Sequence, residues 1–178
     1  MPSTQGDDGV ITIRTHRPED VAHVMSRHGV LYADEFGWDP QVMEGLVDNT
    51  CADFLNTYDP SHERFWIAER HQDGQVKFAG SVMVLHDKDD PAHKSATIRL
   101  LLVEPSERGK GLGTRLVRQV IEFAREEARG YRRVMLWMPS EMAAARRIYQ
   151  REGFEKVAEI EHEVFGKKST AESWGLNF

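Results

Sequence analysis

The feature that most constrains this chain is a glycine-rich turn between an apolar segment and an amphipathic one. Residues 96–103 are almost continuously apolar at their end, which predicts a central strand covered on both faces. Residues 112–124 carry apolar side chains at i, i+3 and i, i+4 spacing, which predicts a helix. Three glycines in residues 109–113 join the two segments and leave main-chain N–H groups uncovered at the positive end of that helix. The turn therefore predicts an anion site.

The charge next to this turn favours a pyrophosphate as the anion, because Arg108 and Lys110 add charge-assisted hydrogen bonds. A P-loop requires G-x-x-x-x-G-K-[ST], and here Lys110 precedes Gly111. A Rossmann fingerprint requires G-x-G-x-x-G, whose last position falls on Thr114 or on Leu116. Both nucleotide-binding patterns fail on spacing. The plain alternative is a flexible turn that only lets a strand reach a helix.

The remaining pattern predicts one α/β domain built on a mixed sheet, in the order β-α-α-β-β-β-α-β-α-β-β. Residues 1–9 are expected to be a disordered lead, and residues 10–178 a single domain. Besides the strand and helix already given, strands are expected at 10–16, 65–68, 77–85, 132–138, 154–160 and 174–178, and helices at 18–31, 39–54 and 140–152.

Charge and composition exclude several classes of function. A formal net charge of −6 disfavours binding to nucleic acid, and the apolar runs are far shorter than the ~20 residues that span a bilayer. The single cysteine, Cys51, excludes an internal disulfide, and the eight histidines show no metal-ligand spacing, so no metal is expected. Residues 1–9 have no signal-peptide character, and a cytoplasmic location is expected.

Two motifs together resemble the GCN5-related N-acetyltransferase (GNAT) superfamily. The first is R-x-x-G-x-G at residues 108–113, after a strand that ends in Val-Glu-Pro; the second is Tyr-x-x-x-Gly-Phe at residues 149–154, after a run of alanines. Residues 28–39 and 165–176 further resemble the acetyltransferase half of bacterial proteins in which a MarR-type DNA-binding domain precedes a GNAT domain. No such domain fits before the first strand, so a stand-alone relative is expected.

The resemblance implies the GNAT fold, acetyl-CoA as cosubstrate and a set of cofactor-binding residues. A helix of small residues lets the pantetheine arm lie alongside, and Tyr149 would protonate the departing thiolate. The alternative for Tyr149 is packing over the sheet. Pro139 stands where many members carry an asparagine, so either Ser140 substitutes or that contact is missing. The implied cofactor-binding residues are Leu102, Val103, Arg108, Gly109, Lys110, Gly111, Leu112, Gly113, Thr114, Ser140, Ala144 and Tyr149.

The reaction implied by the resemblance is direct attack of a primary amine, in a small molecule or a peptide, on the acetyl thioester. The N–H of Val103 would stabilise the oxyanion. Candidates for the base or the acceptor site, besides the catalytic Tyr149, are Glu104, Glu35 and His28. For Glu35 and His28 the alternative is that they cap or solvate helix ends.

A second function from a different class stays open: a non-catalytic acyl-CoA sensor or regulatory partner with the same fold. Pro139 and the undetermined base favour the sensor, whereas Tyr149 favours the enzyme. Trp174 and Phe178 are expected either to seal the sheet edge or to form a homodimer contact.

Overall fold

The computed structural model describes residues 9–164 and 167–178. The predicted disordered lead lies outside the described residues except for Gly9, and so do Phe165 and Gly166. The predicted element order is confirmed, with two added 3₁₀ turns at Pro105–Glu107 and Glu127–Arg129. The elements are β1 (Val10–Thr15), α1 (Pro18–Phe36), α2 (Pro40–Thr57), β2 (Arg64–Gln72), β3 (Gln75–His86), β4 (Ser95–Val103), α3 (Leu112–Arg125), β5 (Arg133–Pro139), α4 (Ala143–Arg151), β6 (Glu155–Val164) and β7 (Lys167–Asn177).

Several predicted boundaries were wrong, among them the end of α1, which reaches Phe36 rather than residue 31, and the starts of α4 and β7. Helix α4 begins at Ala143 rather than at Ser140, because the Ser140 N–H donates to the Thr170 carbonyl at 2.8 Å and continues the β5–β7 pairing. Strand β7 begins at Lys167 rather than at Trp174, because it pairs with β6 and with β5 along most of its length. Its first half is polar, so the sequence gives no apolar alternation there.

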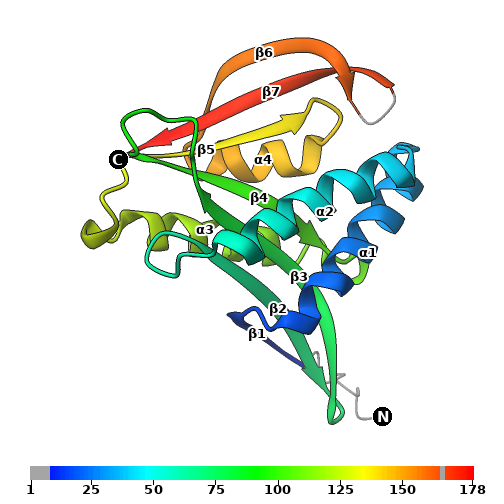
Figure 1. Ribbon diagram of the computed structural model, residues 1–178. Coiled ribbons are helices and arrows are strands. Elements are labelled where there is room, and N and C mark those ends of the chain that lie inside the picture. The colour runs from blue at the N-terminus through cyan, green and yellow to red at the C-terminus, as the bar shows by residue number, and fades with distance from the viewer. Residues whose placement is uncertain (1–8, 165–166) are drawn as a thin grey trace.

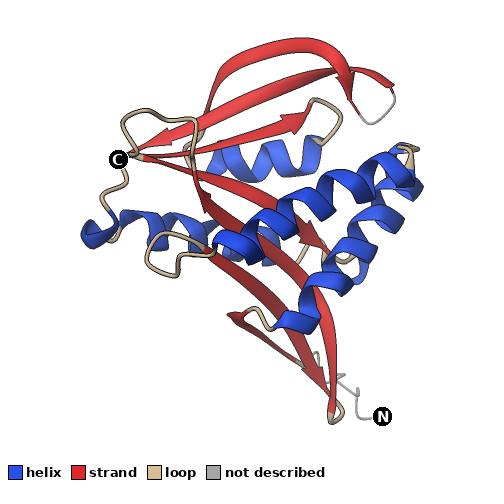
Figure 2. Ribbon diagram, viewed as in Figure 1, coloured by secondary structure: helices blue, strands red, loops and turns tan. Residues whose placement is uncertain are grey.

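The sheet has the strand order β1-β2-β3-β4-β5-β7-β6, with helices on both faces (Figures 1 and 2). One core cluster packs the sheet against α3 and α4, and the other packs it against α1 and α2. Among the described strands, only β4 and β5 pair in parallel, and their register covers just Ser95–Thr97 with Arg133–Met135. Beyond these three pairs the two strands diverge. The middle of the sheet is therefore open towards the end of β4.

A β-bulge in β4 lies next to this opening. Met83 pairs with Arg99 and Ser81 pairs with Leu102, so β4 carries one residue more than β3 between these positions. Leu100 has a φ of 52°, a left-handed conformation that is strained for a leucine. The Ser81 hydroxyl donates to the Leu100 carbonyl at 3.2 Å and holds it there. Such bulges redirect side chains beside functional sites.

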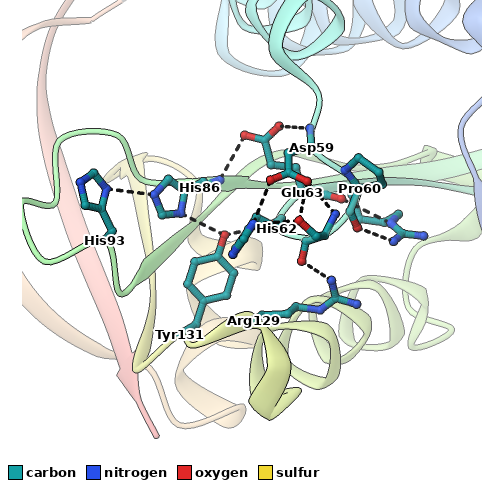
Figure 3. A network of polar contacts seen from close by, with 10 residues as sticks. Asp59, Pro60, His62, Glu63, His86, His93, Arg129 and Tyr131 are labelled. Carbon is teal, nitrogen blue, oxygen red and sulfur yellow. Dashed lines mark hydrogen bonds and ion pairs between the residues drawn. The ribbon is translucent and has the colours of Figure 1, made fainter.

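A polar network fastens the segment before β2 to the segment before β5 (Figure 3). The Tyr131 hydroxyl donates to the His62 carbonyl at 2.8 Å and lies 3.3 Å from His86 Nδ1. The Arg129 guanidinium donates to the Ser61 carbonyl. Hydrogen bonds from Ser61 and His62 lower the pKa of Asp59 to about 2. None of these residues lines the cavity described below, and we assign the network a structural role.

The described residues show neither a helix that could span a membrane nor a cluster of metal ligands. None of the helices in these parts of the chain combines the length and the apolar character needed to cross a bilayer. Within the same residues, no group of three or more His, Cys, Asp or Glu side chains is placed to hold a metal ion.

Candidate functional site

The glycine turn places the uncapped end of α3 at an open surface. Gly109 and Gly111 have φ values of 72° and 80°, which favour glycine strongly. Gly111 is also the N-cap of α3, where no side chain makes a capping hydrogen bond. A Cβ built on either glycine would meet no atom within 4 Å, so the space above the turn is free. The first N–H groups of α3 therefore fit an anion such as a diphosphate.

Gly113 has a different role, because it brings α3 against α4. A Cβ at this position would lie 2.6 Å from Ile148 Cδ1. A larger residue would have to displace the end of the Ile148 side chain, which belongs to the helix that carries Tyr149. The last glycine of the motif thus lies where α3 and α4 pack closely. The neighbouring Leu112 is buried in the core, and Thr114 is partly exposed.

The two cations predicted to bind phosphate both have carboxylate partners here. Arg108 donates through Nη2 to Glu35 Oε1 at 2.6 Å and through Nε to the Val103 carbonyl at 3.1 Å. Lys110 is more loosely placed, with its Nζ 3.7 Å from Glu107 Oε2. Glu107 is bound chiefly by Arg70, whose hydrogen bonds lower the pKa of that carboxyl. Lys110 is therefore the cation freer to turn towards a ligand.

A cavity of about 250 Å³ lies where β4 and β5 diverge. Its lining comes from α1, α2, β4, β5, α4 and the segment before α4. Some lining residues belong to the core on the α3–α4 face, among them Ile98 and Tyr149. Others belong to the core on the α1–α2 face, among them Tyr32 and Trp38. The cavity therefore passes through the sheet from one face to the other.

Tyr149 lies in this cavity with only 4% of its surface exposed. Burial, and secondarily the nearby Tyr32, raises the pKa of its phenol, so the group is protonated at neutral pH. The hydroxyl makes no hydrogen bond with the residues that the structure describes, and its ring packs 5.4 Å from that of Phe154. Tyr149 is thus an available proton donor.

His28 lines the same cavity and is fully buried. Its Nδ1 lies 2.8 Å from the Val24 carbonyl. Since a carbonyl only accepts, we assign the ring proton to Nδ1. Nε2 is then a buried acceptor, and it has no partner among the described residues. Burial lowers the pKa of His28 to about 4, which keeps the ring neutral.

The two carboxylates proposed from sequence do not line the cavity. Glu104 accepts from Arg27 Nε at 2.6 Å and from Arg27 Nη2 at 2.8 Å, in a bidentate ion pair. Glu35 is paired with Arg108. The structure thus brings His28 and Tyr149 together and leaves both glutamates outside.

The main chain of Val103 faces the opening. In an antiparallel ladder, hydrogen-bonded and non-hydrogen-bonded pairs alternate. The Glu104 N–H donates to the Ala79 carbonyl at 2.9 Å, so the neighbouring Gly80–Val103 pair is the non-hydrogen-bonded one. The Val103 N–H and carbonyl therefore point away from β3, towards the side on which β5 has diverged. The Arg108 bond to the Val103 carbonyl fits this orientation.

The other predicted contacts differ in detail. Ala145, not Ala144, lines the cavity, since Ala144 is exposed on the outer face of α4. The N–H of Ser140 is already bonded to Thr170, while Pro139 lines the cavity itself. Leu102 is buried in the core on the α1–α2 face.

The sequence analysis missed Arg99, which lines the cavity from β4. The available signal was a charged residue in the middle of the run Ile98-Arg99-Leu100-Leu101-Leu102. Tyr32 was also not among the predicted site residues. Its hydroxyl donates to the Leu101 carbonyl at 3.1 Å, which ties α1 to the bulged part of β4.

The pattern of the acetyltransferase (GNAT) family matches residues 31–154, which include the whole glycine turn, the diverging strands and Tyr149. The chain belongs to this GNAT family. It is similar to N-acetyltransferase family 8 member 2 of Rattus norvegicus, with 37% identity over 106 residues, which are 59% of this chain and 44% of that relative. The chain spans about half the length of the curated relatives it matches.

Solved GNAT structures have the same fold. A GCN5-related N-acetyltransferase from Kribbella flavida aligns with a TM-score of 0.71 at 17% identity, over 94% of this chain and 98% of that one. An acetyltransferase from Salmonella typhimurium, solved with acetyl-CoA, aligns with a TM-score of 0.69 at 21% identity, over 94% and 93% of the two chains. At these identities the likeness establishes the fold.

Proposed function

We propose that this chain is an N-acetyltransferase that transfers the acetyl group of acetyl-CoA to a primary amine of a small molecule or peptide by direct attack. The observation that carries the proposal is the cavity that crosses the sheet between β4 and β5. Tyr149 lines it from the α3–α4 side, and His28 lines it from α1. Two substrates that enter from opposite faces would meet there.

The α3–α4 side fits acetyl-CoA. The uncapped N-terminus of α3 offers N–H donors beside Gly109 and Gly111, and Arg108 and Lys110 supply positive charge. The Salmonella typhimurium neighbour, solved with acetyl-CoA, supports this assignment at the level of the fold. Ala145, which is small, leaves room for an elongated arm to enter the cavity.

The chain's own groups then serve the transfer. The amine nitrogen attacks the carbonyl carbon, and the Val103 N–H stabilises the oxyanion that forms. As the carbon–sulfur bond breaks, Tyr149 donates its proton to the thiolate. The attacking nitrogen loses one proton when the amide forms, and that proton restores the Tyr149 phenol by way of solvent. His28 Nε2 accepts a hydrogen bond from the amine N–H and orients its lone pair.

The remaining step is removal of a proton from the acceptor, which is an ammonium ion in solution at pH 7. The pKa of a lysine-like amine lies about 3.4 units above pH 7, so deprotonating it at that pH costs about 4.6 kcal/mol. No carboxylate lines the cavity among the described residues, and His28, with a pKa of about 4, is too weak a base to hold that proton. We propose that the amine loses its proton to water before it enters, so the rate rises with pH up to the amine pKa.

The cellular location and the oligomeric state of the enzyme are further parts of the proposed function. We propose a cytoplasmic relative of the acetyltransferase half of MarR–GNAT proteins. For the homodimer, Phe178 is the better candidate contact: it is 41% exposed, with the Arg125 guanidinium 5.1 Å from its ring. Trp174 is buried in the core instead.

The test is thiol release from acetyl-CoA with purified protein and a panel of primary amines, with coenzyme A binding measured separately by calorimetry. We expect binding together with amine-dependent release. Absence of any coenzyme A binding would refute the proposal. Binding without release across a broad panel would favour the acyl-CoA sensor instead.

A further inference from the structure

Arg99 lies in the cavity on the α1–α2 side of the sheet. It pairs with Met83, and directly paired residues of two strands project to the same face. Met83 is part of the core that packs against α1 and α2. Tyr149 belongs to the opposite core, so the cavity presents a cation on one face and a phenol on the other.

The guanidinium of Arg99 makes no hydrogen bond or ion pair with the part of the chain that the structure describes. The negative charge of Asp87 acts on this guanidinium, without an ion pair between them. Burial lowers the pKa of Arg99. By contrast, hydrogen bonds to carboxylates raise the pKa of Arg14 and of Arg27. Arg99 is therefore a partly buried cation that lines the cavity without a carboxylate partner among the described residues.

A partly buried cation loses some of its solvation, and no anion among the described residues offsets that loss. A planar carboxylate restores the balance, since it accepts two parallel hydrogen bonds from the guanidinium fork. The walls around Arg99 are largely apolar and include Trp38, Trp137 and Met43. The site thus combines one fixed positive charge with an apolar surface.

We propose that Arg99 is the specificity residue for the acceptor, and that the acceptor is a primary amine that also carries a carboxylate and an apolar group, as an apolar amino acid does. This inference rests on the proposed function and names the substrate class of the same site. The carboxylate pairs with Arg99 on the α1–α2 face, and the amine points towards the opening between β4 and β5.

Phenylalanine and phenethylamine are the probes, because they differ only in the carboxylate. Rates of thiol release are compared per neutral amine, with each amine pKa measured by titration. In the wild-type protein, we expect kcat/KM for phenylalanine to exceed that for phenethylamine by about 10- to 100-fold. In Arg99→Met, we expect the phenylalanine value to fall by about that factor, while phenethylamine changes by less than about threefold.

Controls separate this role from a structural one. Arg132→Gln removes an exposed arginine from the segment before β5 and should leave the ratio unchanged. Arg99→Lys keeps the charge but loses the fork, so it should restore part of the preference. Arg99→Met should bind coenzyme A normally and should not lower the Tm, since it replaces an unpaired cation by an apolar side chain.

A readout without turnover keeps the two proposals apart. Trp38 and Trp137 line the cavity, so N-acetylphenylalanine should change the intrinsic fluorescence. We expect the titration to be at least about tenfold weaker in Arg99→Met, and weaker in the wild type for the corresponding amide. Equal rates for the two amines in the wild type, with coenzyme A bound, would overturn the role of Arg99 and leave the acetyltransferase standing. Absence of all turnover would overturn the acetyltransferase, and the fluorescence titration would then decide on Arg99 alone.

Discussion

Arg108 Nη2 lies 2.6 Å from Glu35 Oε1, so an ion pair joins the turn before α3 to the last turn of α1 across 73 residues of sequence. A diphosphate at the glycine turn must compete with Glu35 for this guanidinium. Exposed pairs of this kind contribute only about 0–1 kcal/mol. We therefore expect Glu35→Gln to tighten coenzyme A binding by about two- to fivefold, as measured by calorimetry.

The matched control for this experiment is Glu152→Gln. It releases Arg118, whose Nε lies 3.0 Å from Glu152 Oε2 on the exposed face of α3. Coenzyme A affinity should not change in this variant. If Glu35→Gln weakens binding, Glu35 orients Arg108 rather than competing for it.

Removing the hydroxyl of Tyr149 should slow the chemical step selectively. The phenol is buried, protonated and unpaired within the described residues, so its loss removes a proton donor and no structural hydrogen bond. We expect Tyr149→Phe to lower kcat by about 10²-fold, with coenzyme A affinity near normal, in steady-state assays. Tyr58→Phe, outside the cavity, should have little effect. A rate unchanged in Tyr149→Phe removes this residue from the mechanism.

Burial of His28 makes stability depend on pH. Its folded pKa is about 4, against an ordinary value of 6.5. Between these values the unfolded chain binds more protons, so the free energy of unfolding falls as the pH drops from about 6.5 to about 4. The contribution of this one residue is about 3 kcal/mol.

Denaturant titrations at pH 7 and pH 4 measure this effect. In His28→Leu the difference between the two pH values should be smaller than in the wild type by about 2–3 kcal/mol. His16, whose pKa burial also lowers, is present in both proteins and cancels in the comparison. Equal pH dependence in both proteins would contradict the buried, neutral state of His28.

Alanine substitutions at Gly80 and Gly45 should change the stability of the fold in opposite directions. A Cβ on Gly80 would lie 2.5 Å from the Leu102 carbonyl oxygen, where β3 and β4 approach closely beside the bulge. We expect Gly80→Ala to destabilise the fold by about 2 kcal/mol or more. Gly45 lies in α2 with nothing within 4 Å of a Cβ, so Gly45→Ala should stabilise by about 0.5–1 kcal/mol. Thermal unfolding of the two variants checks both signs.

The order of elements could be predicted because its signals are local. The Asp39 cap of α2, whose carboxylate accepts from the Gln41 N–H at 2.9 Å, and the turn at Gly74, with φ 71°, are fixed by a few neighbouring residues. The glycine turn and Gly153, with φ 92° after α4, are recognisable for the same reason. These signals place the anion site and Tyr149 without any tertiary information.

The rest of the site depends on residues far apart in sequence. Glu104 is paired with Arg27, 77 residues away, and no local pattern shows that this carboxylate is already engaged. The left-handed Leu100 and the divergence of β4 from β5 arise from register, which spacing alone does not give. Arg99 looked like one charge in an apolar strand, and only the packing of both faces shows where it lies.

The short parallel register between β4 and β5 has a mechanical consequence. Among the described residues, three paired positions join strands β1–β4 to strands β5–β7, so the sheet consists of two antiparallel parts joined along a narrow strip. A ligand that fills the cavity between β4 and β5 contacts both parts of the sheet and holds them together. The Tm should therefore rise more with ligand occupancy of this cavity than it would if the sheet were continuous.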